Sequence, residues 1–81
     1  MVRSTHNPRE LGRLISTHRL AAGLSRRQLV ERVNELDGSI SYRHLSRIEA
    51  GTAPPPRLDR IIRIARALEV DVAQLIPEAS P

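Results

Sequence analysis

The sequence predicts a small all-α domain built from five helical segments. Apolar residues recur at spacings of three and four residues, which is the period of an amphipathic helix. Capping residues stand before these runs, and glycine or proline stands after them. The 81 residues show no strand-type alternation, and 40% of them are hydrophobic but only one is aromatic. We therefore expect a single core of aliphatic side chains.

Local signals mark where each helix begins and ends. Pro8 suits the first helical position after Asn7, and Glu10 is placed to complete a capping box there. Capping boxes of the form S-x-x-Q or D-x-x-Q also open the second and fifth segments. The five predicted segments begin at or near Asn7, Ser25, Ser41, Leu58 and Asp71. The breaks that follow them include Gly23, Asp37-Gly38, Gly51 and Pro77.

The fourth segment, about residues 58–68, follows a stiff proline-rich connector at residues 52–56. Its pattern predicts a wide apolar face and a solvated side that carries three arginines. The predicted apolar face is Leu58, Ile61, Ile62, Ala65 and Leu68. The solvated side is Arg60, Arg63 and Arg66.

Charge is distributed unevenly along the chain. All 13 basic residues are arginine, and with nine acids they give a net charge of +4. Residues 1–57 carry +5 and residues 58–81 carry −1. A basic front half and a nearly neutral back half suit a polyanion-binding face with a separate second surface. Alternatively, the exclusive use of arginine only reflects the base composition of the genome.

Several functional classes are disfavoured by the residues present. There is no cysteine, and the three histidines (His6, His18 and His44) lack metal-ligand spacing, so no metal site or cofactor is expected. No apolar run is long enough for a membrane helix and the first residues do not resemble a secretory signal, so we expect a cytoplasmic protein. No catalytic motif or glycine-rich phosphate loop appears, so we do not expect an enzyme.

Four stretches together resemble a known family. They read "LGRLI", "RLAAGLSRRQLVERV", "ISYRHLSRIEAG" and "RLDRIIRIARALEVDVAQLI". Over residues 11–76 the chain resembles the phage-repressor/Cro-type (XRE-like) helix-turn-helix family. The resemblance implies a lambda-repressor-like five-helix bundle at residues 7–77, between a flexible arm (1–6) and a tail (78–81). It also implies that the third helix enters the major groove of duplex DNA while the second crosses the backbone.

The resemblance assigns roles to residues on and around the third helix. Arg43 and Arg47 are four residues apart, so they share one helix face, and either guanidinium can pair with a guanine edge. The alternative is a solvated charged face, and for Tyr42 it is an exposed aromatic at a helix start. The implied base-reading residues are Tyr42, Arg43, Ser46 and Arg47. The implied phosphate-binding residues are Arg26, Arg27, Ser41, His44, Thr52 and Arg57.

Two further sets are expected to be architectural. The resemblance makes Arg19 and Glu49 an ion pair between the first and third helices, so Glu49→Ala should lower stability more than specificity. A homodimer surface is expected at the weakly charged back end. Its residues are Val70, Val72, Leu75 and Ile76, which alternatively only close the monomer core.

The chain also departs from the family pattern in the connection between the second and third helices. Residues 34–39 make it several residues longer, which should lengthen the second helix or the loop after it. Glu69 stands where the family often has a cap glycine, and His18 stands where it has an aliphatic residue.

The leading interpretation is a repressor that binds a pseudo-palindromic operator in double-stranded DNA as a homodimer. No small-molecule effector is expected, since no residues remain for a sensing domain. The alternative is a protein-interaction module, such as an antitoxin that covers a protein partner and regulates its own synthesis. RNA binding is disfavoured because stacking aromatics are missing.

Overall fold

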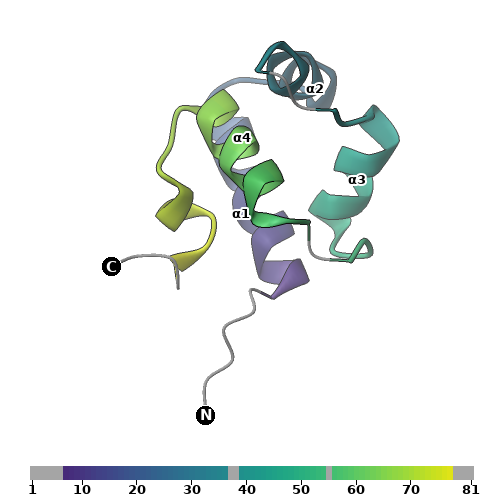
Figure 1. Ribbon diagram of the computed structural model, residues 1–81, viewed down its shortest axis with the longest axis vertical. Helices are drawn as coiled ribbons and strands as arrows, with labels where there is room; N and C mark the ends of the chain where they lie inside the picture. Colours follow the sequence, from purple (N-terminus) through teal and green to yellow (C-terminus); the bar gives the residue numbers. More distant parts are fainter. Residues whose placement is uncertain (1–6, 37–38, 55, 78–81) are drawn as a thin grey trace.

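The computed structural model describes residues 7–36, 39–54 and 56–77, and the predicted arm and tail lie outside these ranges. Four α-helices follow one another in this part of the chain, which contains no strand (Figure 1). Helix α1 packs against α3, and α2 packs against both α3 and α4. The helices are Pro8–Ala21 (α1), Arg26–Glu35 (α2), Tyr42–Ala50 (α3) and Leu58–Leu68 (α4).

The fifth predicted helix is a single 3₁₀ turn, Val72–Gln74 (η1), so the expected count of five α-helices is wrong. The Leu75 N–H donates to the Val72 carbonyl at 2.9 Å, which is the three-residue spacing of a 3₁₀ turn. Only five residues separate the cap at Asp71 from Pro77, and Pro77 has no N–H with which to extend a helix. The segment is therefore too short for more than one turn.

Helix starts follow the predicted caps, with one difference at α1. The capping box of Ser25 and Gln28 is confirmed, since each side chain accepts the other's backbone N–H, at 2.8 and 3.1 Å. At α1, Asn7 Oδ1 accepts the Glu10 N–H at 3.3 Å, but the Glu10 carboxylate pairs with Arg13 at 2.7 Å. The predicted capping box at α1 is thus only half formed, because a guanidinium is a stronger partner than a backbone N–H.

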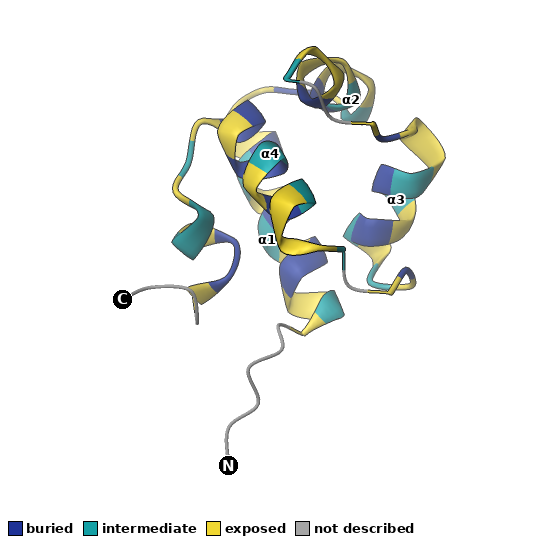
Figure 2. Ribbon diagram, in the orientation of Figure 1, coloured by how far each residue is buried: buried dark blue, intermediate teal, exposed yellow. Residues whose placement is uncertain are grey.

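The inward faces of the four helices form one aliphatic core, and their outward faces are exposed (Figure 2). The face that α4 buries differs from the prediction. Leu58 and Ile62 are 53% and 39% exposed, whereas Ile64 and Ala67, outside the predicted stripe, are buried. The large side chains with almost no exposed surface are Leu11, Ile15, Leu29, Val33, Leu45, Ile61, Ile64 and Leu75.

Two glycines fix how α3 sits in the bundle. A Cβ on Gly12 would lie 2.6 Å from the Glu49 carbonyl oxygen and still nearer to that of Ile48, so α1 and α3 touch through their backbones. Gly51 ends α3 with φ 76°, a left-handed conformation that glycine adopts without strain. Helices α1 and α3 are therefore in direct contact.

The longer connection between α2 and α3 is closed by one amide side chain. Asn34 Oδ1 accepts the Ile40 N–H at 3.0 Å, and its Nδ2 donates to the Ile40 carbonyl at 3.2 Å. Ile40 is buried, so this pair anchors the chain just before the cap at Ser41. The predicted turn at Asp37-Gly38 lies outside the described residues.

Candidate nucleic-acid interface

The outer face of α3 presents three of its predicted base-reading residues. Tyr42 is 48% exposed, and Arg43 and Arg47 are exposed one helical turn apart. Neither arginine forms an ion pair with another described residue. Their guanidinium groups are therefore available to bind an external acceptor.

Ser46 lies differently from the other predicted base readers. Its Oγ is buried and has no hydrogen-bond partner among the described residues. Ser46 is one turn from Tyr42 and nearly one turn from Glu49, so all three lie on one side of α3. The hydroxyl is covered, and contact with a base requires its neighbours to move.

A single carboxylate joins α1, α2 and α3. Glu49, whose side chain is 2% exposed, accepts hydrogen bonds from Arg19 Nε at 2.8 Å and Nη2 at 3.1 Å, and from Ser16 Oγ at 2.9 Å. Arg19 also donates to the Leu24 carbonyl at 2.9 Å. Arg19 and Glu49 thus form the ion pair that the family resemblance implied. Burial raises the pKa of Glu49, but the hydrogen bonds from Arg19, Arg26 and Ser16 outweigh burial and hold it below its usual value.

Arg26 also belongs to this cluster. The sequence analysis assigned Arg26 to a phosphate contact and did not predict its contact with Glu49. Its Nε donates to Glu49 Oε1 at 2.9 Å, and 40% of its side chain remains exposed. The hydrogen bond to Glu49, and then that to Tyr42, raises the pKa of Arg26. The carboxylate holds one edge of the guanidinium, and the exposed part stays open to a phosphate.

His44 contacts an arginine that the sequence had placed on a solvated face. Its Nδ1 lies 3.1 Å from Arg60 Nη1, which joins α3 to α4. A guanidinium has only donors, so Nδ1 accepts this hydrogen bond and carries no proton. Burial, followed by the charges of Arg60 and Arg47, lowers the pKa of His44. A neutral His44 has no positive charge with which to attract a phosphate, whereas Arg60 supplies a cation beside it.

The remaining phosphate candidates flank the ends of the helices. Ser41 caps α3, with its Oγ accepting the His44 N–H at 3.0 Å. Thr52 lies just past Gly51, and its N–H donates to the Arg47 carbonyl at 3.1 Å. The exposed phosphate candidates are Arg27, Ser41, Thr52 and Arg57.

Comparison with known proteins identifies this arrangement. A family model described as a helix-turn-helix domain matches residues 10–76, which is most of the chain. The chain belongs to the helix-turn-helix domain family. That family lies in the XRE-like superfamily. The helix-turn-helix domain indicates DNA binding and transcription regulation. No curated protein and no solved structure matches the chain.

The predicted dimer residues of this helix-turn-helix domain lie after α4. Leu75 and Ile76 are 1% and 4% exposed, so they close the monomer core and offer no surface to a partner. Val70 and Val72 pack against that core and remain partly exposed.

None of the described helices is long and apolar enough to cross a membrane.

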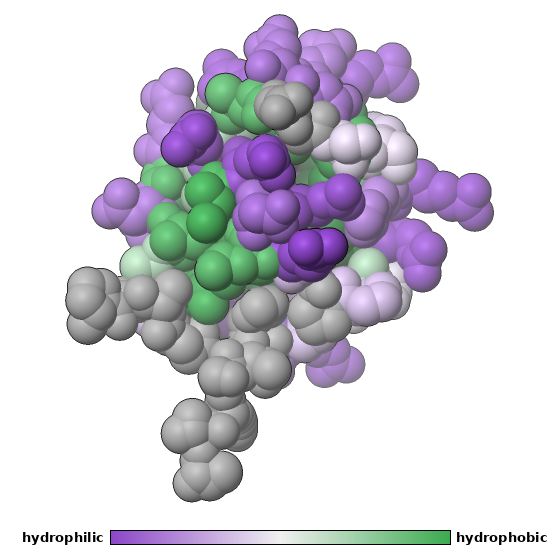
Figure 3. Space-filling view, viewed as in Figure 1, coloured by the Kyte–Doolittle hydropathy of each residue, from purple (hydrophilic) through white to green (hydrophobic). Residues whose placement is uncertain are grey.

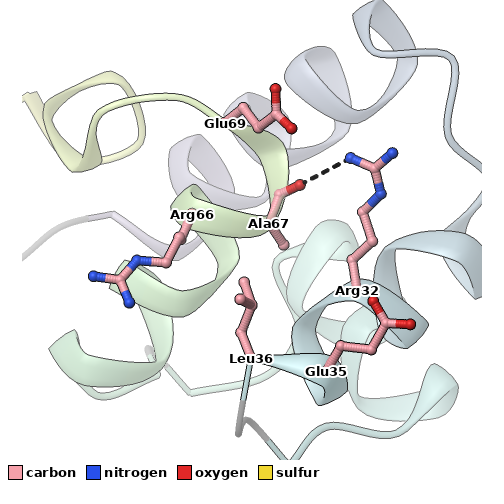
Figure 4. Close-up of a pocket in the computed structure, with 6 residues that line it drawn as sticks. All are labelled: Arg32, Glu35, Leu36, Arg66, Ala67 and Glu69. Carbon is pink, nitrogen blue, oxygen red and sulfur yellow. Dashed lines mark hydrogen bonds between the residues drawn. The ribbon is translucent and has the colours of Figure 1, made fainter.

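The helix-turn-helix domain also has a shallow pocket of about 220 Å³ between the C-terminal ends of α2 and α4 (Figure 4). Arg32 donates to the Ala67 carbonyl at 3.4 Å across it, which ties α2 to α4. Two arginines and two glutamates line the pocket, and no predicted site residue does. Its lining is Arg32, Glu35, Leu36, Arg66, Ala67 and Glu69.

Proposed function

We propose that this protein is a phage-repressor/Cro-type repressor that binds a pseudo-palindromic DNA operator as a homodimer, with α3 in the major groove. The observation that carries the proposal is the exposed pair Arg43 and Arg47, one turn apart on a helix whose position is fixed. A guanidinium that pairs with O6 and N7 of guanine contributes roughly 1–3 kcal/mol of discrimination. The proposal places the protein with DNA in the cytoplasm and includes no enzymatic activity.

The close contacts of α3 with α1 and α2 support sequence reading over general attraction to phosphate. Gly12 brings α3 against α1, and Glu49 ties its last turn to Arg19 and Arg26. A reading helix must hold its side chains in one register with the base edges. Arg26, Arg27 and Ser41 stand at the starts of α2 and α3, where N–H groups and cations suit phosphates.

The test is selection from a randomised duplex pool at about 0.15 M salt with excess non-specific competitor, because low salt favours any basic protein. We expect an enriched inverted repeat. Arg43→Ala and Arg47→Ala should each relax the preference at different base positions. Arg13→Ala is the matched control, since it removes an exposed arginine paired with Glu10 on α1. Bulk, salt-sensitive binding without an enriched sequence would contradict the proposal.

A further inference from the structure

Helix α4 leaves an apolar strip in solvent. Leu58 and Ile62, four residues apart, are 53% and 39% exposed, although the core lies directly beneath α4. Figure 3 shows hydrophobic side chains gathered over α4 and η1, next to polar neighbours. Val70, just after α4, and Val72, the first residue of η1, are also apolar and partly exposed. An exposed apolar surface with a polar rim is typical of an interaction site.

The net charge of this surface favours a second copy of the chain as its partner. Residues 58–77, which contain α4, η1 and the residues beside them, carry three arginines and three acids and are neutral, whereas residues 1–57 carry +5. Two of these acids, Glu69 and Asp71, lie between α4 and η1 and balance the arginines of α4. A second copy of the chain would be repelled at the basic side and meets no net repulsion here. A strongly acidic or basic partner would gain little from a balanced surface.

The order of charges along α4 is also self-complementary. Asp59 stands in its first turn and Arg66 in its last, with Ile62 between them. In an antiparallel pair related by a two-fold axis, the residue on the axis meets its own copy, and the two ends of the helix exchange places. With Ile62 on the axis, Leu58 covers the aliphatic stem of Arg66 of the second copy, and Asp59 comes near that guanidinium.

We propose that the Leu58–Ile62 strip of α4, extended by Val70 and Val72, is the surface through which two copies of this chain associate. The inference rests on the homodimer of the proposed function and locates its interface. It replaces the interface predicted at Leu75 and Ile76, whose side chains are buried within each copy.

Sedimentation equilibrium without DNA tests the interface. The parent should dimerise, and Ile62→Glu and Leu58→Glu should each raise the dimer dissociation constant by about tenfold or more, since each places a charge in an apolar contact. Leu20→Glu is the matched control, because Leu20 is 66% exposed on α1 and outside the strip. Its dimer dissociation constant should equal that of the parent. A monomeric parent, or glutamate variants that dimerise like the parent, would overturn the proposal.

A cross-link tests the same geometry without disturbing packing. The chain has no cysteine, so Ile62→Cys introduces a single thiol. Two copies with residue 62 on the axis should form a disulfide on mild oxidation, which needs Cα atoms about 4.4–6.8 Å apart. Leu20→Cys should stay monomeric on a non-reducing gel. Equal cross-linking of both variants would count against the proposed contact.

The experiments distinguish failure of the interface from failure of the proposed function. Glutamate variants that dimerise like the parent would remove this interface and leave the homodimer and base reading by α3 intact. A dimer that the glutamate substitutions disrupt but that enriches no DNA sequence would support the interface and contradict base reading. A monomeric parent would contradict both the interface and the homodimer of the proposed function.

Discussion

Among single residues, Glu49 carries the most connections. Its carboxylate accepts from Ser16 and Arg19 of α1 and from Arg26 of α2, so three helices meet at one buried charge. Removing one partner of such a cluster costs far more than the cluster contributes net, because the remaining charge stays buried and unpaired.

Glu49→Ala should therefore destabilise the fold by about 3–5 kcal/mol, the range for breaking a buried ion pair. Arg19, with its side chain 9% exposed, would keep only the Leu24 carbonyl as acceptor. Urea unfolding measures the loss, and Glu10→Ala is the control because its ion pair with Arg13 is exposed on the surface. Parent-like unfolding of Glu49→Ala would show that the cluster is not structural.

The lowered pKa of Glu49 makes its contribution depend on pH. Because the pKa in the fold lies below the ordinary value of 4.5, the stability from this carboxylate is complete above that value and is lost as pH falls through the folded pKa. Unfolding free energies of the parent and Glu49→Gln should differ at pH 7 and converge in acid. A difference that stays constant from pH 7 to pH 3 would exclude ionisation as the cause.

Residue roles were only partly predictable from the sequence. The shared face of Arg43 and Arg47 follows from a four-residue spacing inside one helix. The partners of Arg26 and His44 are 23 and 16 residues away, and sequence spacing carries no information about contacts between helices. For the same reason the burial of Ser46 Oγ had no signal in the sequence.

For the helices, boundaries were predicted more accurately than orientations. Caps such as Ser25 and Ser41 act through neighbouring N–H groups, so local sequence is sufficient to place them. The rotation of α4 was partly wrong because two apolar stripes overlap along it, and only packing against the rest of the core decides that Ile64 is buried and Ile62 exposed.

Gly12→Ala should separate α1 from α3. The added Cβ meets the backbone carbonyls of Ile48 and Glu49, which cannot rotate away as a side chain would. We expect the free energy of unfolding to fall by about 1–3 kcal/mol, which is typical of overpacking, and binding to the proposed operator to weaken as α3 shifts. Thermal unfolding measures the first effect, and Thr17→Ala is the control because Thr17 is exposed on α1. Stability equal to that of the control would contradict the close approach.

Glu69→Gly should stabilise the protein. Glu69 ends α4 with φ 61° and ψ 40°, the left-handed conformation of the cap glycine that the family often has at this position. A residue with a side chain is strained in this conformation by roughly 1–2 kcal/mol, and glycine removes that strain. Glycine also makes the unfolded chain more flexible, which offsets part of the gain in stability. We expect a net gain of about 0.5–1 kcal/mol in urea unfolding. Glu69→Ala, which keeps the Cβ, should show no such gain.

At the scale of the whole molecule, the size and charge of the chain are compatible with the proposed dimer, in which one copy binds on each turn of DNA. The chain extends 38 × 25 × 23 Å, and half-sites one turn apart are about 34 Å from centre to centre. Two copies in contact can therefore place one α3 in each of two successive major grooves. In the proposed dimer, the basic helices α1–α3 face the duplex, and the neutral region of residues 58–77 is left for the second copy.

This arrangement predicts a strict dependence on half-site spacing. Inserting about five base pairs between the half-sites turns one of them to the opposite face of the duplex, where a dimer held by a fixed contact cannot reach it. Titration should show the affinity falling to that of a duplex with a single half-site, with a smaller salt dependence because fewer phosphates are contacted. If the copies instead bind independently, the lengthened site will bind as tightly as the original, and contact between subunits will have no part in recognition.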